Sequence, residues 1–182
     1  MSQSDEPSSG ARGGDHPIDR LIRQLADDPH AVPTDEQLRQ IARHVASAPF
    51  NPQFADMPPV VEAEYLGRPI GARGPSLFQH LIKRVLYDEQ WAFGTTEKQL
   101  LDDFRRAATA PTARIGLRTR GPTYIVMIHT PTADVIPVER LGPGIGPNLL
   151  GSYSANRGIT VTGYMVNDTN LGRQTRGVRW LT

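Results

Sequence analysis

Two short stretches of the chain carry residue types suited to chemistry on a phosphate group. In the first, His80 and Arg84 are four residues apart, and Lys83 and Tyr87 follow the same three- and four-residue spacing. This spacing places the four side chains on one side of a helix. Histidine exchanges a proton near neutral pH, and arginine has a planar fork of donors that matches phosphate oxygens. The first stretch therefore combines a proton carrier with phosphate-binding cations.

The second stretch reads as a strand in which hydroxyl and apolar side chains alternate. Residues 158–166 contain no proline and are rich in threonine and β-branched residues, a composition that favours extended backbone. Successive side chains of a strand point to opposite faces. One face is therefore expected to carry Thr160, Thr162 and Tyr164. Such a row of hydroxyls is either an ordinary wet sheet surface or the floor of a site that holds a phosphate.

Together, the two stretches contain the groups that metal-independent cleavage of RNA requires. One group must take the proton of the 2′-hydroxyl, another must protonate the leaving 5′-oxygen, and cations must stabilise the charged transition state. Histidine suits the proton transfers, arginine suits the phosphate, and hydroxyls on a facing strand can orient it. The competing interpretation is a histidine on a solvated helix face, beside threonine and tyrosine residues that simply favour strands.

The elements upstream of these stretches are expected to form a helical hairpin over residues 16–48. A first helix opens at His16 and ends before Pro29, and a second begins with a capping box formed by Thr34 and Gln37. Each helix has an apolar stripe at three- and four-residue spacing. The next segment, 49–75, contains six prolines. It is expected to be a connector with at most one short strand, near 60–66.

The remaining residues are expected to fold as two helices followed by antiparallel strands. The first helix begins at Ser76 and runs to about residue 87, and the second begins with a capping box at Thr96 and Gln99. Predicted strands then follow at 114–119, 123–130, 134–138, 149–154, 159–166 and 178–181. This order predicts an α+β fold, with the two helices packed on an antiparallel sheet of about four to five strands.

Length and composition limit the domain organisation and the chemistry. A chain of 182 residues predicts one domain with tails. The expected parts are a disordered tail (1–15), the hairpin (16–48), the connector (49–75) and an α+β unit (76–182). The absence of cysteine and of histidine pairs at ligand spacing predicts no metal and no cofactor. No apolar run is long enough for a membrane span. The expected location is the cytoplasm, or export as an effector without a classical signal peptide.

Charge is unevenly divided along the chain. Residues 1–66 carry a net charge of −6 and residues 67–182 a net charge of +7, within a formal total of +1. A basic C-terminal part suggests an anionic partner such as RNA. The acidic hairpin is hypothesised to screen that basic surface, and the simpler alternative is that it extends the fold or mediates contacts between protomers. The candidates for substrate binding are Lys83, Tyr87, Arg118 and Arg157.

The arrangement of these motifs resembles the barnase–EndoU–colicin–RelE superfamily of bacterial ribonuclease toxin domains. The shared features lie within residues 76–182: a helix carrying His-x-x-x-Arg, a second helix, an antiparallel sheet, and a late strand that reads Thr-Gly-Tyr. The resemblance implies RNA as the substrate and a cognate immunity or antitoxin protein as a partner. It implies catalytic roles for His80, Arg84, Thr162 and Tyr164.

Two classes of function follow from the sequence. The first is a metal-independent RNA-cleaving toxin domain of a bacterial conflict or toxin–antitoxin system, an endoribonuclease that acts by phosphodiester transesterification. The second is a non-catalytic binding or assembly module that uses the basic face of the same α+β scaffold. The enzyme requires His80 and Tyr164 to share a cleft with Arg84 at its wall.

Overall fold

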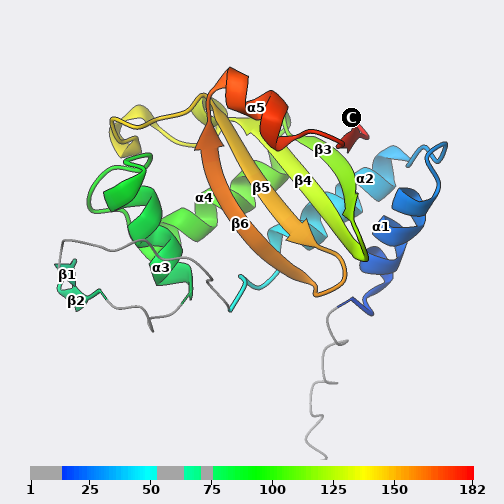
Figure 1. The fold of residues 1–182 in the computed structure, drawn as a ribbon, viewed down its shortest axis with the longest axis horizontal. Coiled ribbons are helices and arrows are strands. Elements are labelled where there is room, and N and C mark those ends of the chain that lie inside the picture. The colour runs from blue at the N-terminus through cyan, green and yellow to red at the C-terminus, as the bar shows by residue number, and fades with distance from the viewer. Residues whose placement is uncertain (1–13, 53–63, 71–75) are drawn as a thin grey trace, which may run out of the picture.

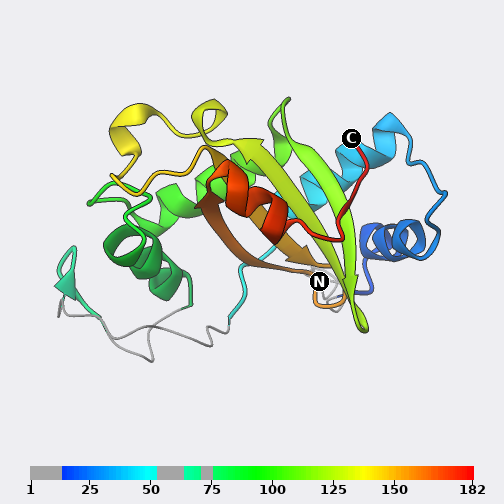
Figure 2. The ribbon, with the colours of Figure 1, turned by 45° about the horizontal axis from the view of Figure 1, so that its top comes forward.

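The computed structural model describes residues 14–52, 64–70 and 76–182, which form an α+β fold with a five-stranded antiparallel sheet. Helices α1 (Pro17–Asp27), α2 (Asp35–Ala46) and α4 (Glu97–Thr109) lie on one side of the sheet (Figure 1). The short α5 (Asp168–Gln174) lies against the other side in both views (Figure 1 and Figure 2). The predicted fold class, including the N-terminal helical hairpin, is confirmed.

The sheet has the strand order β6-β5-β4-β3-β7, in which the four long strands follow one another along the chain. The strands are β3 (Arg114–Arg120), β4 (Thr123–Pro131), β5 (Asn148–Ser154), β6 (Ile159–Val166) and β7 (Arg179–Trp180). Each end agrees with the predicted strands to within one residue. Strand β6 forms one edge of the sheet, and the short β7 forms the other.

The predicted strand at 134–138 is wrong. Two short 3-10 turns, Thr132–Asp134 and Val138–Arg140, occupy this region. The N–H groups of Val135 and Ile136 donate back to the carbonyl of Thr132, and the following Pro137 has no N–H to donate. Local bonds therefore replace the ladder that a strand would need.

Helix termini follow the predicted capping patterns. Thr34 and Gln37 make both hydrogen bonds of a capping box at α2, and Thr96 and Gln99 make both at α4. Helix α3 (Ser76–Ile82) passes directly into a π-helical turn, η1 (Lys83–Tyr87). Helix α5 has no counterpart among the predicted elements, because its sequence is polar and lacks an apolar stripe.

The predicted connector contains one small element within the described residues. Strands β1 (Glu64–Tyr65) and β2 (Arg68–Pro69) form a two-stranded hairpin, and the ring of Tyr65 is buried against Phe78 of α3. The predicted strand near 60–66 lies mostly outside the described residues, as does the tail expected to be disordered.

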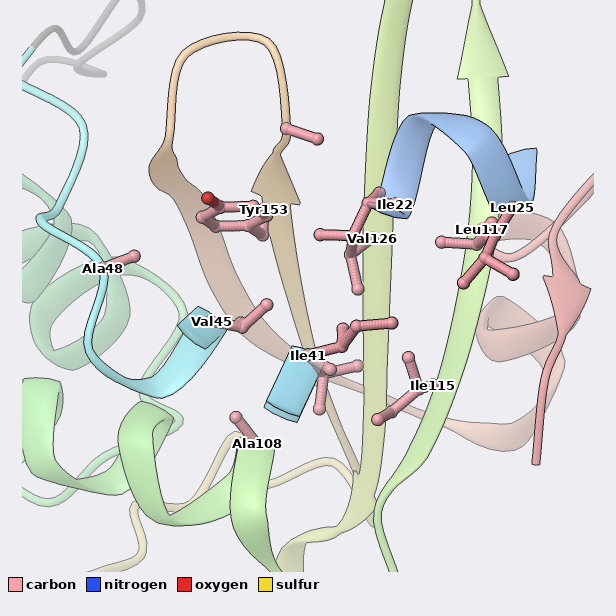
Figure 3. Close-up of a cluster of buried hydrophobic side chains, with 12 residues drawn as sticks. Ile22, Leu25, Ile41, Val45, Ala48, Ala108, Ile115, Leu117, Val126 and Tyr153 are labelled. Carbon is pink, nitrogen blue, oxygen red and sulfur yellow. The ribbon is translucent and has the colours of Figure 1, made fainter. Parts of the chain in front are cut away.

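The hairpin and the sheet share one hydrophobic core. Figure 3 shows side chains of α1, α2 and α4 meeting side chains of β3, β4 and β5. Ile22 of α1, Ile41 of α2 and Val126 of β4 are each fully buried in this cluster. A second cluster lies under α3 and α4, around Trp91. The helical hairpin, which the sequence predicts as a separate acidic segment, therefore packs against the sheet as part of the same core.

A buried polar network fastens the hairpin to the sheet. The hydroxyl of Tyr153 on β5 donates to the carboxylate of Asp19 on α1 at 2.5 Å, and both residues are at most 1% exposed. The Nε2 atom of His44 on α2 lies 3.0 Å from the same carboxylate oxygen. Burial, and then the neighbouring Asp19, raises the pKa of the Tyr153 phenol. The phenol therefore keeps the proton that this buried carboxylate needs.

Candidate functional site

The predicted site residue Arg84 is buried and reaches the edge strand β6. Its Nε donates to the carbonyl oxygen of Gly163 at 2.8 Å, and one terminal nitrogen lies 3.2 Å from the hydroxyl oxygen of Thr162. The other terminal nitrogen pairs with Asp88 at 2.6 Å. Arg84 lies in the π-helical turn, where the larger number of residues per turn changes the direction of side chains relative to an α-helix. The predicted pair Arg84 and Thr162 is therefore in direct contact.

A β-bulge divides the expected row of hydroxyls on β6. Thr160 is paired with Tyr153, whereas Thr162 is paired with Ser152, the preceding residue of β5. Adjacent residues of β5 point to opposite faces, so Thr160 and Thr162 also point to opposite faces, with Val161 as the extra residue. The expectation that Thr160, Thr162 and Tyr164 share one face is wrong for Thr160.

The outer edge of β6 is covered along its length by groups from elsewhere in the chain. Near its start, the backbone of Thr160 bonds to that of Pro49 and Asn51. Near its end, the Gln90 side-chain amide donates to the carbonyl of Met165 at 2.8 Å and accepts from its N–H at 2.9 Å. Together with the Arg84 bond, these contacts close an edge that would otherwise be open to pairing with another strand. Arg84 thus has a structural role as well as a position in the site.

Tyr164 lies where several positive charges converge. The guanidinium carbon of Arg84 is 5.4 Å from the centre of its ring, within reach of a cation–π interaction. Its hydroxyl donates to the side-chain oxygen of Gln174 on α5 at 2.9 Å. Burial raises the pKa of the phenol, and the positive charges of Arg84, Arg118 and Arg120 oppose that rise. Tyr164 is therefore a neutral, half-buried phenol in a positive field.

His80 is buried, in contrast to the solvent-facing position that the helix pattern suggests. His80 is 5% exposed, as are Gln79 and Arg84. The ring makes an edge contact with Phe50, at 4.6 Å between centroids. Burial, followed by the charges of Arg84 and Lys83, lowers the pKa of His80 to about 3. The imidazole is therefore neutral at physiological pH, and a role in proton transfer would need access that this packing restricts.

An open cleft of about 400 Å³ lies between the end of β3 and the segment that links α5 to β7. The cleft, called the arginine cleft below, is lined by Arg118, Thr119, Arg120, Arg173, Gln174, Arg176 and Gly177. The lining contains four guanidinium groups and no carboxylate. Through Gln174, the cleft adjoins the hydroxyl of Tyr164. A much smaller space of about 30 Å³ between α2, α4 and the sheet is a packing gap in the core.

Arg118 connects the predicted residues to the arginine cleft. One of its terminal nitrogens donates to two backbone carbonyls, that of Gln174 at 3.0 Å and that of Arg176 at 3.4 Å. These bonds hold the segment after α5 against β3. Burial, and then the charge of Arg120, lowers the pKa of Arg118. The guanidiniums of Arg118 and Arg120 are therefore close enough to repel each other.

The other predicted binding residues lie away from this cleft. Lys83 and Tyr87 are on the π-helical turn, where Tyr87 is 38% exposed. Arg157 is in the turn before β6, at the end opposite Tyr164, and its side chain bonds to Asn51 at 3.5 Å. The acidic hairpin contributes no residue to the lining, because α1 and α2 pack against the other face of the sheet. Within the described residues, no ion pair joins an acid of the hairpin to a base of residues 67–182, so the hypothesis that the hairpin screens the basic surface stays a prediction.

Sequence reasoning missed three arginines of the cleft: Arg120, Arg173 and Arg176. A signal for them exists in the sequence, because each lies within four residues before a glycine turn. Arg118 and Arg120 precede the turn at Gly121, and Arg173 and Arg176 precede Gly177. Pairing of β7 with β3 then brings the two turns together.

Comparisons with known proteins do not assign this chain to a family: no family model, no curated protein and no solved structure matches it. Within the described ranges, no cluster of three or more histidine or acidic residues is arranged to hold a metal ion. None of the helices in those ranges is both long and apolar enough to cross a membrane.

Proposed function

We propose that this protein binds RNA through the arginine cleft and the adjoining sheet surface around Tyr164. The observation that carries the proposal is the convergence of Arg84, Arg118 and Arg120 on the Tyr164 phenol, beside a cleft without carboxylates. Guanidinium groups bind phosphate oxygens through two donors at once. An aromatic ring beside them is the kind of surface on which a base of single-stranded RNA stacks.

Salt dependence and charge removal test this proposal. The probe is a fluorescein-labelled single-stranded RNA, and binding is measured by anisotropy over a series of salt concentrations. Arg120→Gln and Arg173→Gln should each weaken binding and reduce the slope of log affinity against log salt by about one. Arg39→Gln is the matched control, because it removes one positive charge from an exposed position on α2, in the helix layer. Equal effects of all three variants would refute binding at the cleft.

A second candidate function, cleavage of the bound RNA, is favoured by the protonated phenol of Tyr164 in this positive field. In such a reaction the 2′-oxygen attacks phosphorus and loses its proton to a base, and the bond to the 5′-oxygen breaks. Tyr164 would give its proton to the leaving 5′-oxygen, while Arg84 and Arg118 stabilise the negative charge. The products are a 2′,3′-cyclic phosphate and a 5′-hydroxyl end. His80 contacts Phe50 on the α4 side of the sheet, whereas Tyr164 contacts α5 on the other side, so the two side chains do not share the cleft that this mechanism requires. The role of His80 as general acid or base stays a prediction that this arrangement does not support.

RNA incubated with the purified protein in excess EDTA separates cleavage from binding. The enzyme hypothesis predicts fragments with 2′,3′-cyclic phosphate ends, which Tyr164→Phe abolishes while RNA binding persists. Cleavage that survives His80→Ala in a folded protein would remove His80 from the mechanism. Intact RNA with the wild-type protein would leave a binding module. If cleavage occurs, expression should inhibit growth, and a cognate immunity or antitoxin protein would be the expected partner.

A further inference from the structure

The arginine cleft holds more positive charge than one backbone phosphate can balance. Within the described residues, no ion pair joins a carboxylate to any of its four arginines. The other lining residues, Thr119, Gln174 and Gly177, are neutral. The guanidiniums of Arg118 and Arg120 repel each other, and Arg173 and Arg176 line the same volume of about 400 Å³. A ligand with clustered negative charge would relieve this repulsion most effectively.

The form of the cleft also distinguishes among phosphate ligands. The phosphates of a duplex lie on a convex surface, and along a strand each linkage brings a single negative charge. A terminal phosphate already carries about −1.5 to −2 at pH 7, and a terminal di- or triphosphate concentrates further charge within a few bonds. The open cleft of about 400 Å³ has room for such a group, and most of its lining residues are exposed to solvent.

Arg118 holds both sides of the cleft in place. Its side chain donates to the backbone carbonyls of Gln174 and Arg176. These bonds hold the segment that carries Arg173 and Arg176 beside Arg120. Gln174 in turn accepts from the Tyr164 hydroxyl, so the aromatic ring lies next to the charged group. A nucleoside attached at that end of a bound polyphosphate would have the Tyr164 ring as a stacking surface.

From this charge and geometry we infer that the arginine cleft binds a clustered polyphosphate: the di- or triphosphate group of a 5′-terminal nucleotide. The inference rests on the proposed RNA binding for its preferred source, the 5′ end of an RNA strand. A free nucleoside triphosphate carries the same group and is the other source.

The test compares one single-stranded RNA, labelled at its 3′ end, with a 5′-hydroxyl, a 5′-monophosphate or a 5′-triphosphate. Anisotropy is measured in EDTA at about 0.15 M salt. The triphosphate form should bind at least about tenfold more tightly than the hydroxyl form, with the monophosphate between them. The double variant R173Q/R176Q should lose this preference, and R39Q should retain it. Competition by ATP and by inorganic triphosphate shows whether the free nucleotide is bound as well as the RNA end.

The outcomes separate this inference from the proposed function. Equal affinity for the hydroxyl and triphosphate forms would overturn the polyphosphate site and leave RNA binding intact. Binding of ATP without binding of any RNA would support the polyphosphate site and overturn RNA binding. Absence of binding to every probe would overturn both.

Discussion

The Nε atom of Arg84 donates to the carbonyl oxygen of Gly163 at 2.8 Å, across 79 residues of sequence. This bond joins the π-helical turn to the edge of the sheet and leaves the guanidinium facing Thr162 and Tyr164. An arginine of a proposed phosphate site is thus also a structural support. Its removal has consequences for stability that a residue acting only on a substrate would not have.

Arg84→Gln should lower the free energy of unfolding by about 3 kcal/mol. The substitution leaves Asp88 without its buried partner and removes a donor from the edge of β6. The measurement is urea unfolding followed by circular dichroism. Arg39→Gln breaks an exposed pair with Glu36 and should change the unfolding free energy by less than about 1 kcal/mol. Similar small effects for both variants would show that Arg84 is not a structural support.

Tyr153→Phe should destabilise the protein by about 1–3 kcal/mol, because the carboxylate of Asp19 loses a donor that water cannot replace. The chain offers a matched control in Tyr124, whose hydroxyl donates to Asp27 of the same helix at an exposed site. Tyr124→Phe should cost less than about 0.5 kcal/mol. Urea unfolding of both variants measures the difference. Equal costs would contradict the view that burial makes the Asp19 bond important.

Acidification should destabilise the protein through His80. The pKa of His80 is about 3 in the folded chain and about 6.5 for an unperturbed histidine. Between these values the unfolded chain binds a proton that the folded chain does not, so stability falls as pH drops below about 6.5. The largest slope from this one group is about 1.4 kcal/mol per pH unit.

Urea unfolding at several pH values from neutral towards 4 measures this contribution. His80→Gln should lose less stability on acidification than the wild type, whatever its stability at neutral pH. His30→Gln, at an exposed position, serves as the control and should follow the wild-type curve. Parallel curves for wild type and His80→Gln would show that His80 is protonated in the folded chain.

Gly163→Ala should destabilise the protein by about 1–3 kcal/mol. A Cβ atom at this position would overlap the ring of Phe104 on α4, and that ring is packed against Trp91. Gly172→Ala is the comparison, because nothing lies within 4 Å of a Cβ added there. Within helix α5 it should stabilise by about 0.5–1 kcal/mol. Thermal and urea unfolding of the pair tests whether close helix–sheet approach requires Gly163.

Local sequence patterns were sufficient to predict most of the elements. The capping boxes at Thr34 and Thr96 mark where two helices begin, and each box is specified by only three or four residues. Alternation and turn residues locate the five strands to within one residue at each end. The errors have two causes. Helix α5 has no apolar stripe that would reveal it, and at 134–138 local hydrogen bonds to the carbonyl of Thr132 replace the pairing of the expected strand.

For the candidate site, the sequence determined that Arg84, Arg118, Thr162 and Tyr164 were chemically suited to a phosphate, because residue type and spacing carry that information. Only the tertiary structure decided which of them meet. The bulge on β6 separates Thr160 from Thr162, and packing against Phe50 removes His80 from solvent. The pairing of β7 with β3 adds Arg173 and Arg176 to Arg118 and Arg120. Contacts between residues far apart in sequence decide burial and register, so a local pattern of charges and hydroxyls cannot reveal them.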